Sequence, residues 1–248
     1  MTHKASLARS DVERLYSRQT GQRRVFAEFS TVLESIERPF PCLFAIQGYQ
    51  SDQLRYIFQA DIDMRLLAIT LGDFLQRARS FGPNTSLVLF TKPDKTVSLD
   101  VYRKTFWTLL HSLVQVDDQP WPNHIPIELS NPLWEFSFAG EPIFVVCNTP
   151  AHLLRQSRKA SCFMVTLQPR WVFDQILGTD KAAEQAFSAV RKRLIPYDPV
   201  LVSPALGKYG HPDTYEYQQY FLSDDNQPAA CPFRTLLGGG STYRHKDR

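Results

Sequence analysis

The chain has 248 residues, of which 43% are hydrophobic and 12% aromatic, so it can bury a sizeable core in one large domain. Its 28 basic and 25 acidic residues give a formal net charge of only +3, which argues against a general nucleic-acid binder. No apolar run approaches membrane-spanning length, and Lys4 and Arg9 are followed by more charge rather than by a signal-peptide core. We therefore expect a cytoplasmic protein without a membrane partner.

The first third of the chain contains helical and strand-like patterns in alternation. A capping box at residues 10–13 and apolar residues at helical spacing up to Ile36 predict one long first helix that Pro39 stops. Short apolar runs at 41–46 and 55–58 predict two strands around a turn at Gly48. A second helix follows over 67–81, ended by Gly82-Pro83.

The remaining patterns complete a mixed α/β (α+β) fold in which helices flank a central mixed sheet. Strands are predicted at 86–90, 142–147 and 162–167, and helices at 99–113 and 182–194. The last two strands are nearly continuous apolar runs, typical of central strands.

The C-terminal part is rich in Pro, Tyr and Asp and has little periodicity over residues 196–232, which predicts a long segment that wraps the core. We assign residues 1–237 to a single domain. Residues 238–248, with three consecutive glycines and a basic end, are predicted to be a flexible tail.

A polar connection, residues 148–159, joins the two central strands and carries His152, Arg155 and Arg158. Scaffolds commonly present functional groups on such connections, so a site is sought there first. Familiar signatures are absent: the sequence has no GxGxxG after a strand, no GxxxxGK[ST], no HExxH and no GxSxG. Rossmann-type flavin or nicotinamide binding, zinc proteolysis and hydrolase chemistry therefore lose support.

The four cysteines are widely spaced and include no CxxC pair, which favours reduced thiols over a zinc site or a disulfide framework. Cys147 and Cys162 fall inside predicted strands and are expected to be packing residues. Cys231, beside Pro232-Phe233, either closes a pocket or anchors the C-terminal segment.

Several sequence blocks, in order along most of the chain, resemble the YqcI/YcgG family. They are Phe40-Pro41-Cys42-Leu43-Phe44-Ala45, Leu110-His111 with Trp121-Pro122, Trp134-Glu135-Phe136-Ser137-Phe138, Gly140-Glu141-Pro142-Ile143-Phe144, Asn148-Thr149-Pro150-Ala151-His152, Gln168-Pro169-Arg170-Trp171-Val172-Phe173, Tyr220-Phe221-Leu222 and Cys231-Pro232-Phe233. Several members of that family are haem-dependent N-hydroxylases of amino acids with basic side chains. The resemblance thus implies a haem b oxygenase.

Under that resemblance, the iron ligand is expected to be a histidine or a cysteine. His152 is our first candidate, because it follows a buried strand in a turn begun by Pro150; the alternative is a histidine that only caps the turn. His111 is the second candidate, as a ligand or as a distal acid or base, although it also suits a boundary position beside Trp107. Cys42 is a rival thiolate ligand, and a buried structural thiol is its alternative.

The resemblance also assigns roles to charged residues. Arg155 and Arg158 are expected to bind haem propionates, and Glu135 or Glu141 to bind the substrate's basic group. Arg170 is expected to bind a propionate or the substrate carboxylate. Trp171 either walls the haem or fills core volume. Solvated arginines and a turn role for Glu141 are the alternatives.

These expectations describe a haem-dependent monooxygenase that hydroxylates a side-chain nitrogen of a basic amino acid or guanidino compound, with L-arginine the leading substrate. Dioxygen or peroxide would be the oxidant, and an external electron donor would be needed because no flavin or nicotinamide site is visible. A homodimer is possible. The rival functions are a haem-binding sensor or carrier without turnover and a haem-free thiol enzyme that pairs Cys42 with a histidine.

Overall fold

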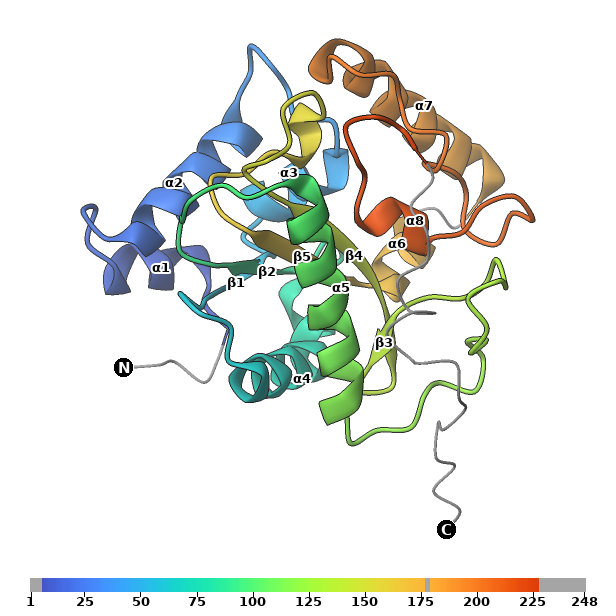
Figure 1. The fold of residues 1–248 in the computed structure, drawn as a ribbon, viewed down its shortest axis with the longest axis horizontal. Helices are drawn as coiled ribbons and strands as arrows, with labels where there is room; N and C mark the ends of the chain where they lie inside the picture. The colour runs from blue at the N-terminus through green and yellow to red at the C-terminus, as the bar shows by residue number, and fades with distance from the viewer. Residues whose placement is uncertain (1–5, 177–178, 228–248) are drawn as a thin grey trace.

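The computed structural model describes residues 6–176 and 179–227, and within them a mixed five-stranded sheet lies between helices (Figure 1). The strand order is β1-β2-β5-β4-β3, where β1 is parallel to β2 and every other neighbouring pair is antiparallel. The strands are β1 (Arg55–Phe58), β2 (Leu87–Phe90), β3 (Ser137–Phe138), β4 (Glu141–Asn148) and β5 (Met164–Pro169). This architecture confirms the predicted fold class.

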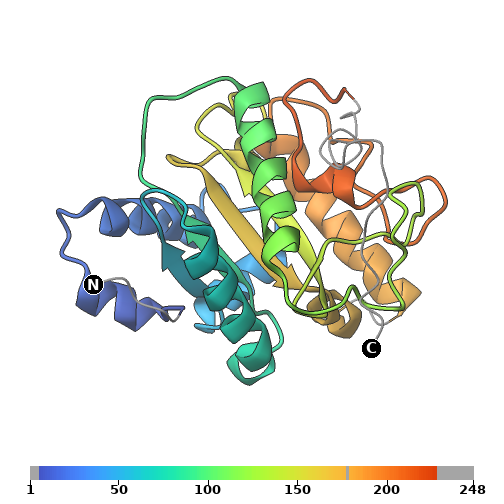
Figure 2. The ribbon, with the colours of Figure 1, turned by 60° about the horizontal axis from the view of Figure 1, so that its bottom comes forward.

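Two long helices, α4 (Met64–Phe81) and α5 (Leu99–Val116), cover one face of the sheet, as Figure 2 shows. Both were predicted from their apolar spacing, and they bury Leu71 and Phe106 in one core with Val165 of the sheet. Gly82 ends α4 with a φ of +121°, where an added side chain would collide with Gln53. The predicted stop signal is therefore confirmed.

The opposite face is covered by α1 (Arg9–Leu15), α2 (Gly21–Glu34) and α3 (Leu43–Gln50), which form a second core around Tyr56. The predicted single long first helix is wrong, because the chain forms two helices there. Thr20 accounts for the break: its backbone is extended, and its hydroxyl accepts a hydrogen bond from the Arg23 amide at the start of α2.

The predicted strand at 41–46 is also wrong, since this segment begins α3. Cys42 is the N-cap of that helix, after Pro41. A short, continuous apolar run fits a buried helix as well as a buried strand, and only its packing partners decide between them. Here the helix packs Ala45 and Ile46 against the second core.

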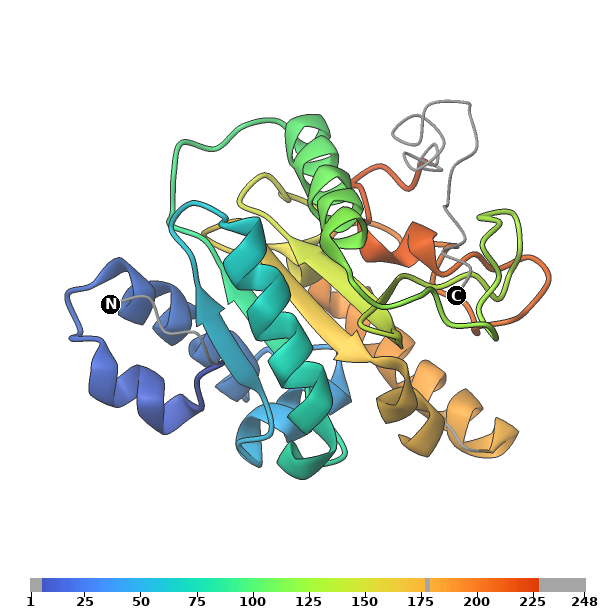
Figure 3. The same cartoon turned by 90° about the horizontal axis from the view of Figure 1, so that it is seen from below.

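The two strands around the polar connection are confirmed as the antiparallel pair β4 and β5, with Val145 opposite Leu167. A short helix, η1 (Gln156–Arg158), lies within the connection. Then follow α6 (Arg170–Ile176), which was not predicted, and α7 (Asp180–Tyr197), which was. Figure 3 shows α6 and α7 at the β4 side of the sheet, away from α1 and α2.

The segment after α7 crosses the molecule as predicted, with one short helix, α8 (Tyr217–Tyr220), among residues 198–227. This helix lies against β4, where Tyr220 meets Phe144 edge to face at a centroid distance of 5.5 Å. Cys231, the end of the predicted domain and the predicted tail at 238–248 lie outside the described residues. Within the described part, no helix has the length and hydrophobicity needed to cross a membrane.

Candidate functional site

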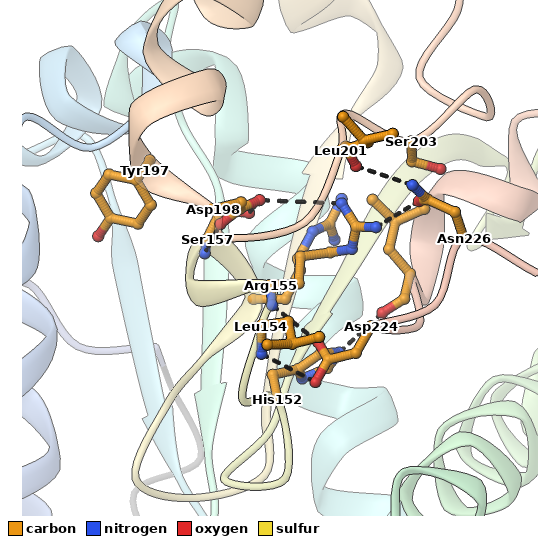
Figure 4. A network of polar contacts seen from close by, with 12 residues as sticks. His152, Leu154, Arg155, Ser157, Tyr197, Asp198, Leu201, Ser203, Asp224 and Asn226 are labelled. Carbon is orange, nitrogen blue, oxygen red and sulfur yellow. Dashed lines mark hydrogen bonds and ion pairs between the residues drawn. The ribbon is translucent and has the colours of Figure 1, made fainter.

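His152 lies fully buried in the polar connection (Figure 4). Both of its ring nitrogens are hydrogen-bonded. Nε2 donates to the Leu222 carbonyl at 2.8 Å, and Nδ1 lies 2.9 Å from the Thr149 hydroxyl. A carbonyl can only accept, so Nε2 carries the proton and Nδ1 accepts from Thr149. Burial lowers the pKa of His152, which keeps the ring neutral.

Asp224 anchors the same connection from the C-terminal segment. Its carboxylate accepts hydrogen bonds from three consecutive backbone amides, those of Leu153, Leu154 and Arg155, at 2.8 to 3.0 Å. Burial raises the pKa of Asp224, but these three donors outweigh it and the net shift is downward. The carboxylate therefore stays charged and holds the turn closed.

The two arginines of the connection are buried and point into the protein. Arg155 donates to the Ser223 carbonyl and to Asn226 Oδ1, and lies 3.9 Å from Asp198. Arg158 donates to the Gln219 carbonyl at 3.0 Å, while its Nη1 has no hydrogen-bond partner among the described residues. Solvated arginines, the alternative considered from sequence, are excluded by this burial.

The haem implied by the resemblance can be tested against these contacts. Iron binding through His152 would require breaking one of two buried hydrogen bonds, so His152 does not fit the ligand role in this arrangement. Arg155 is committed to Asp198 and Asn226 rather than turned toward an open cavity. A metal ion bound directly by side chains is a separate question from haem, and among the described residues no three His, Cys, Asp or Glu side chains are grouped so as to hold one.

Cys42 differs from His152 in that its side chain makes no capping hydrogen bond to α3. Its thiol is partly buried at the start of α3, and burial raises its pKa; the amides of Ala45 and Phe44 and the charge of Arg158 oppose that shift without reversing it, so the free thiol keeps its proton. These are the groups that stabilise a thiolate sulfur once its proton is lost. No histidine in the described ranges hydrogen-bonds to Cys42, so the Cys–His pair of a thiol enzyme is not formed there.

A second polar group, here termed the carboxylate cluster, consists of Glu135, Arg170, Glu216 and Tyr220. Glu135 lies two residues before β3, and Arg170 begins α6 directly after β5. Glu216 is the N-cap of α8, and Tyr220 is the last residue of that helix. Arg170 Nη1 forms a close ion pair with Glu216 and lies 3.5 Å from Glu135 Oε1. The Tyr220 hydroxyl lies 3.2 Å from Glu216 Oε1 and accepts the Phe136 amide.

The carboxylate cluster carries an excess of buried negative charge. Two carboxylates share the single guanidinium of Arg170, and Glu135 is fully buried with its Oε2 lacking a hydrogen-bond partner in the described structure. Burial, and then the charge of Glu216, raise the pKa of Glu135 well above its usual value. One carboxyl of the pair therefore keeps its proton unless a further cation arrives.

The other candidates lie apart from this cluster or at its edge. His111 is half-buried on α5, and Glu141 begins β4 beyond the turn at Ala139-Gly140. Trp171 is on α6, where its ring packs against the core beneath Arg79, with the guanidinium carbon 4.6 Å from the ring centre. The structure thus unites Glu135 with Arg170 but not with Glu141.

Sequence reasoning missed the partners supplied by the C-terminal segment. Glu216 gave no signal, because it lies in a stretch without periodicity. Tyr220 lies in one of the blocks that carry the resemblance, and Asp224 lies in a polar turn. Neither pattern indicates which residue the side chain contacts in the folded protein.

Comparison with known proteins identifies the family. The YqcI/YcgG family model matches residues 29–234. The chain is 40% identical to the uncharacterized protein YqcI of Bacillus subtilis (strain 168) over 92% of its length and 94% of that protein, and 38% identical to the uncharacterized protein YcgG of the same organism over 87% and 88%. The chain therefore belongs to the YqcI/YcgG family.

One further relative has a name that describes a reaction. The chain is 28% identical to a Streptomyces lavendulae protein named "Putative N(omega)-hydroxy-L-arginine synthase DcsA", over 78% of the chain and 77% of that protein. No solved structure matches the chain significantly.

Proposed function

We propose that this protein is an N-hydroxylase that acts on a side-chain nitrogen of a basic amino acid or guanidino compound, with L-arginine as the leading substrate. The proposal is supported by the relative DcsA, whose name describes the synthesis of N-hydroxy-L-arginine. The structural observation that carries it is the carboxylate cluster, where two buried carboxyl groups share one guanidinium and Glu135 Oε2 has no hydrogen-bond partner in the described residues.

A cationic substrate suits this cluster on electrostatic grounds. A buried charge is costly unless it is paired and hydrogen-bonded, so a guanidinium or ammonium group next to Glu135 Oε2 would balance the second carboxylate. Arg170 is already held by Glu216 and by the ring of Tyr209, whose centre lies 3.6 Å from the guanidinium carbon. Arg170 therefore fixes the two carboxylates, and Glu135 presents its free oxygen.

Haem b is the cofactor that we propose, with Cys42 as its ligand in preference to His152 and His111. When bound, haem would supply the oxidation chemistry, with dioxygen or peroxide and an external electron donor. The protein's own contribution would be to orient the substrate nitrogen through Glu135 and to keep it desolvated.

Calorimetric titration with L-arginine tests the substrate part of the proposal without any cofactor. Because the cation replaces a proton shared by Glu135 and Glu216, we expect about one proton to be released on binding. Glu135→Gln should weaken binding at least about tenfold and abolish that release. Asp174→Asn is the matched control, since it also removes a carboxylate near Arg170 but an exposed one, and it should bind as the wild type does.

Haem-loaded protein tests the reaction itself. Turnover with L-arginine should give a product heavier by one oxygen atom, and Cys42→Ser should change the ferric absorption spectrum more than His152→Gln or His111→Gln does. Haem binding without product would favour a sensor or carrier. A colourless protein inactivated by alkylation would favour the thiol enzyme.

A further inference from the structure

A charged groove of about 430 Å³ lies on the sheet face covered by α2, opposite to the α4 and α5 face. Its walls come from α2, from the segment around Phe40, from the polar connection and from Tyr197 at the end of α7. That volume falls in the range of small-molecule sites. None of the residues of the carboxylate cluster lines this groove.

The floor of the groove is apolar and rich in aromatic rings. Phe29 and Phe90 meet edge to face at 5.5 Å, with Met164 beside them. On the wall, Phe40 and Tyr197 form a second edge-to-face pair at 5.9 Å. Such a surface favours a flat aromatic or large aliphatic group, because it offers ring faces and edges but no buried acid to receive a basic side chain.

The rim of the groove carries charges of both signs. Glu28 on α2 and Lys159 on the polar connection are exposed, and neither side chain forms an ion pair or hydrogen bond within the described residues. Arg38 is fixed over the Tyr197 ring at 4.2 Å and donates to the Tyr197 carbonyl. The charge of Glu28 also reaches Cys162, which lines the groove. Burial raises the pKa of the Cys162 thiol to about 12, and the negative charge of Glu28 contributes to that increase.

From this arrangement we propose that the groove is a second binding site, specific for a zwitterionic α-amino acid with an aromatic or large apolar side chain. The ammonium group pairs with Glu28, the carboxylate pairs with Lys159 and Arg38, and the side chain packs on Phe29 and Phe90. Charge-assisted contacts of this kind are the strong ones in small-molecule recognition. The ligand of this site is distinct from the basic substrate of the carboxylate cluster.

The test is calorimetric titration with L-tryptophan, tryptamine and 3-indolepropionate. Tryptamine lacks the carboxylate and 3-indolepropionate lacks the ammonium group, so each should bind roughly two- to fivefold more weakly than L-tryptophan, the range expected for exposed ion pairs. Equal affinity for the three compounds, or no saturable binding of L-tryptophan, would overturn the proposal.

Single substitutions on the rim assign the two charges. Glu28→Gln should weaken the binding of L-tryptophan but not that of 3-indolepropionate, which has no ammonium group. Lys159→Gln should weaken the binding of L-tryptophan but not that of tryptamine, which has no carboxylate. Lys92→Gln is the matched control, because Lys92 is exposed and pairs with Asp61 away from the groove; it should leave all affinities unchanged.

A final variant separates this proposal from the proposed reaction. The Glu135→Gln variant should keep its affinity for L-tryptophan, because Glu135 does not line the groove, while its affinity for L-arginine falls. If Glu135→Gln lost L-tryptophan binding, both ligands would share one site, and the proposal of a second site in the groove would be overturned.

Discussion

The two polar networks that the C-terminal segment completes differ in how fully their charges are compensated. In the network of the polar connection, His152, Arg155 and Asp224 all find hydrogen-bond partners, and only Arg158 Nη1 lacks one among the described residues. In the carboxylate cluster, one guanidinium serves two buried carboxylates and Glu135 Oε2 has no partner in the described residues. Each network includes residues of the sequence blocks that carry the family resemblance, such as His152 in the first and Glu135 and Arg170 in the second.

This difference separates two roles that look alike in sequence. A buried network whose hydrogen bonds are nearly all formed fixes one conformation of the chain and leaves less for a ligand to gain. A buried group left without a partner stores an electrostatic cost that a suitable ligand can remove. We therefore assign the network of the polar connection to structure and the carboxylate cluster to binding.

The largest change in the free energy of unfolding is expected for Arg155→Met. Removing this guanidinium leaves the buried Asp198 carboxylate without its ion pair and Asn226 Oδ1 without its donor. Loss of one partner from a buried pair costs about 3–5 kcal/mol in the free energy of unfolding. Urea denaturation measures the loss, and Arg14→Met, at a pair whose arginine is 70% exposed, should cost less than about 1 kcal/mol. Similar small losses in both variants would contradict the structural role of Arg155.

A smaller, pH-dependent effect is expected for His152→Gln. At neutral pH the variant should lose about 1–3 kcal/mol, because two buried hydrogen bonds are disturbed. The folded-state pKa of His152 is lowered, so the unfolded chain binds the proton more readily, and wild-type stability is lost as pH falls below the unfolded value of about 6.5. Denaturation across this range should show the gap between wild type and variant narrowing in acid. A constant gap would mean that His152 has the same pKa in the folded and the unfolded chain, which would contradict its burial as a neutral ring.

The smallest effect, of opposite sign, is expected for Glu135→Gln. The folded-state pKa of Glu135 is raised, so its contribution is fully present below the unfolded value near 4.5 and is lost as pH rises through the folded pKa. At neutral pH the ligand-free variant should therefore be as stable as the wild type or more stable by about 1 kcal/mol. Thermal unfolding in a pH series measures this. Destabilisation at every pH would reveal a counter-charge that the described residues do not contain.

Local patterns predicted most of the secondary structure, because those patterns report burial directly. The apolar runs at 142–147 and 162–167 became β4 and β5, and helical spacing located α4, α5 and α7. The errors arose where a local signal was ambiguous. The run at 41–46 is apolar on all sides, and Thr20 is an inconspicuous cap inside an otherwise helical pattern.

The candidate site was predicted only in part, for a different physical reason. Residue chemistry and the resemblance indicated Glu135 and Arg170, whose side chains do meet. The carbonyl that engages His152 belongs to Leu222, 70 residues further on, and a backbone acceptor leaves no mark in a sequence. Glu216 likewise depends on where an irregular segment crosses β4, which periodicity does not encode.

The triple contact of Asp224 has a consequence for synthesis of the protein. Asp224 lies 71 residues after Leu153, the first of the residues whose backbone amides donate hydrogen bonds to its carboxylate. At roughly 5–20 residues per second, a ribosome would need on the order of 4 to 14 s to deliver it after Leu153 has been joined. During that interval β4 and β5 can already pair while the turn between them stays unclamped, so a nascent or prematurely terminated chain would expose His152 and Arg155 to water.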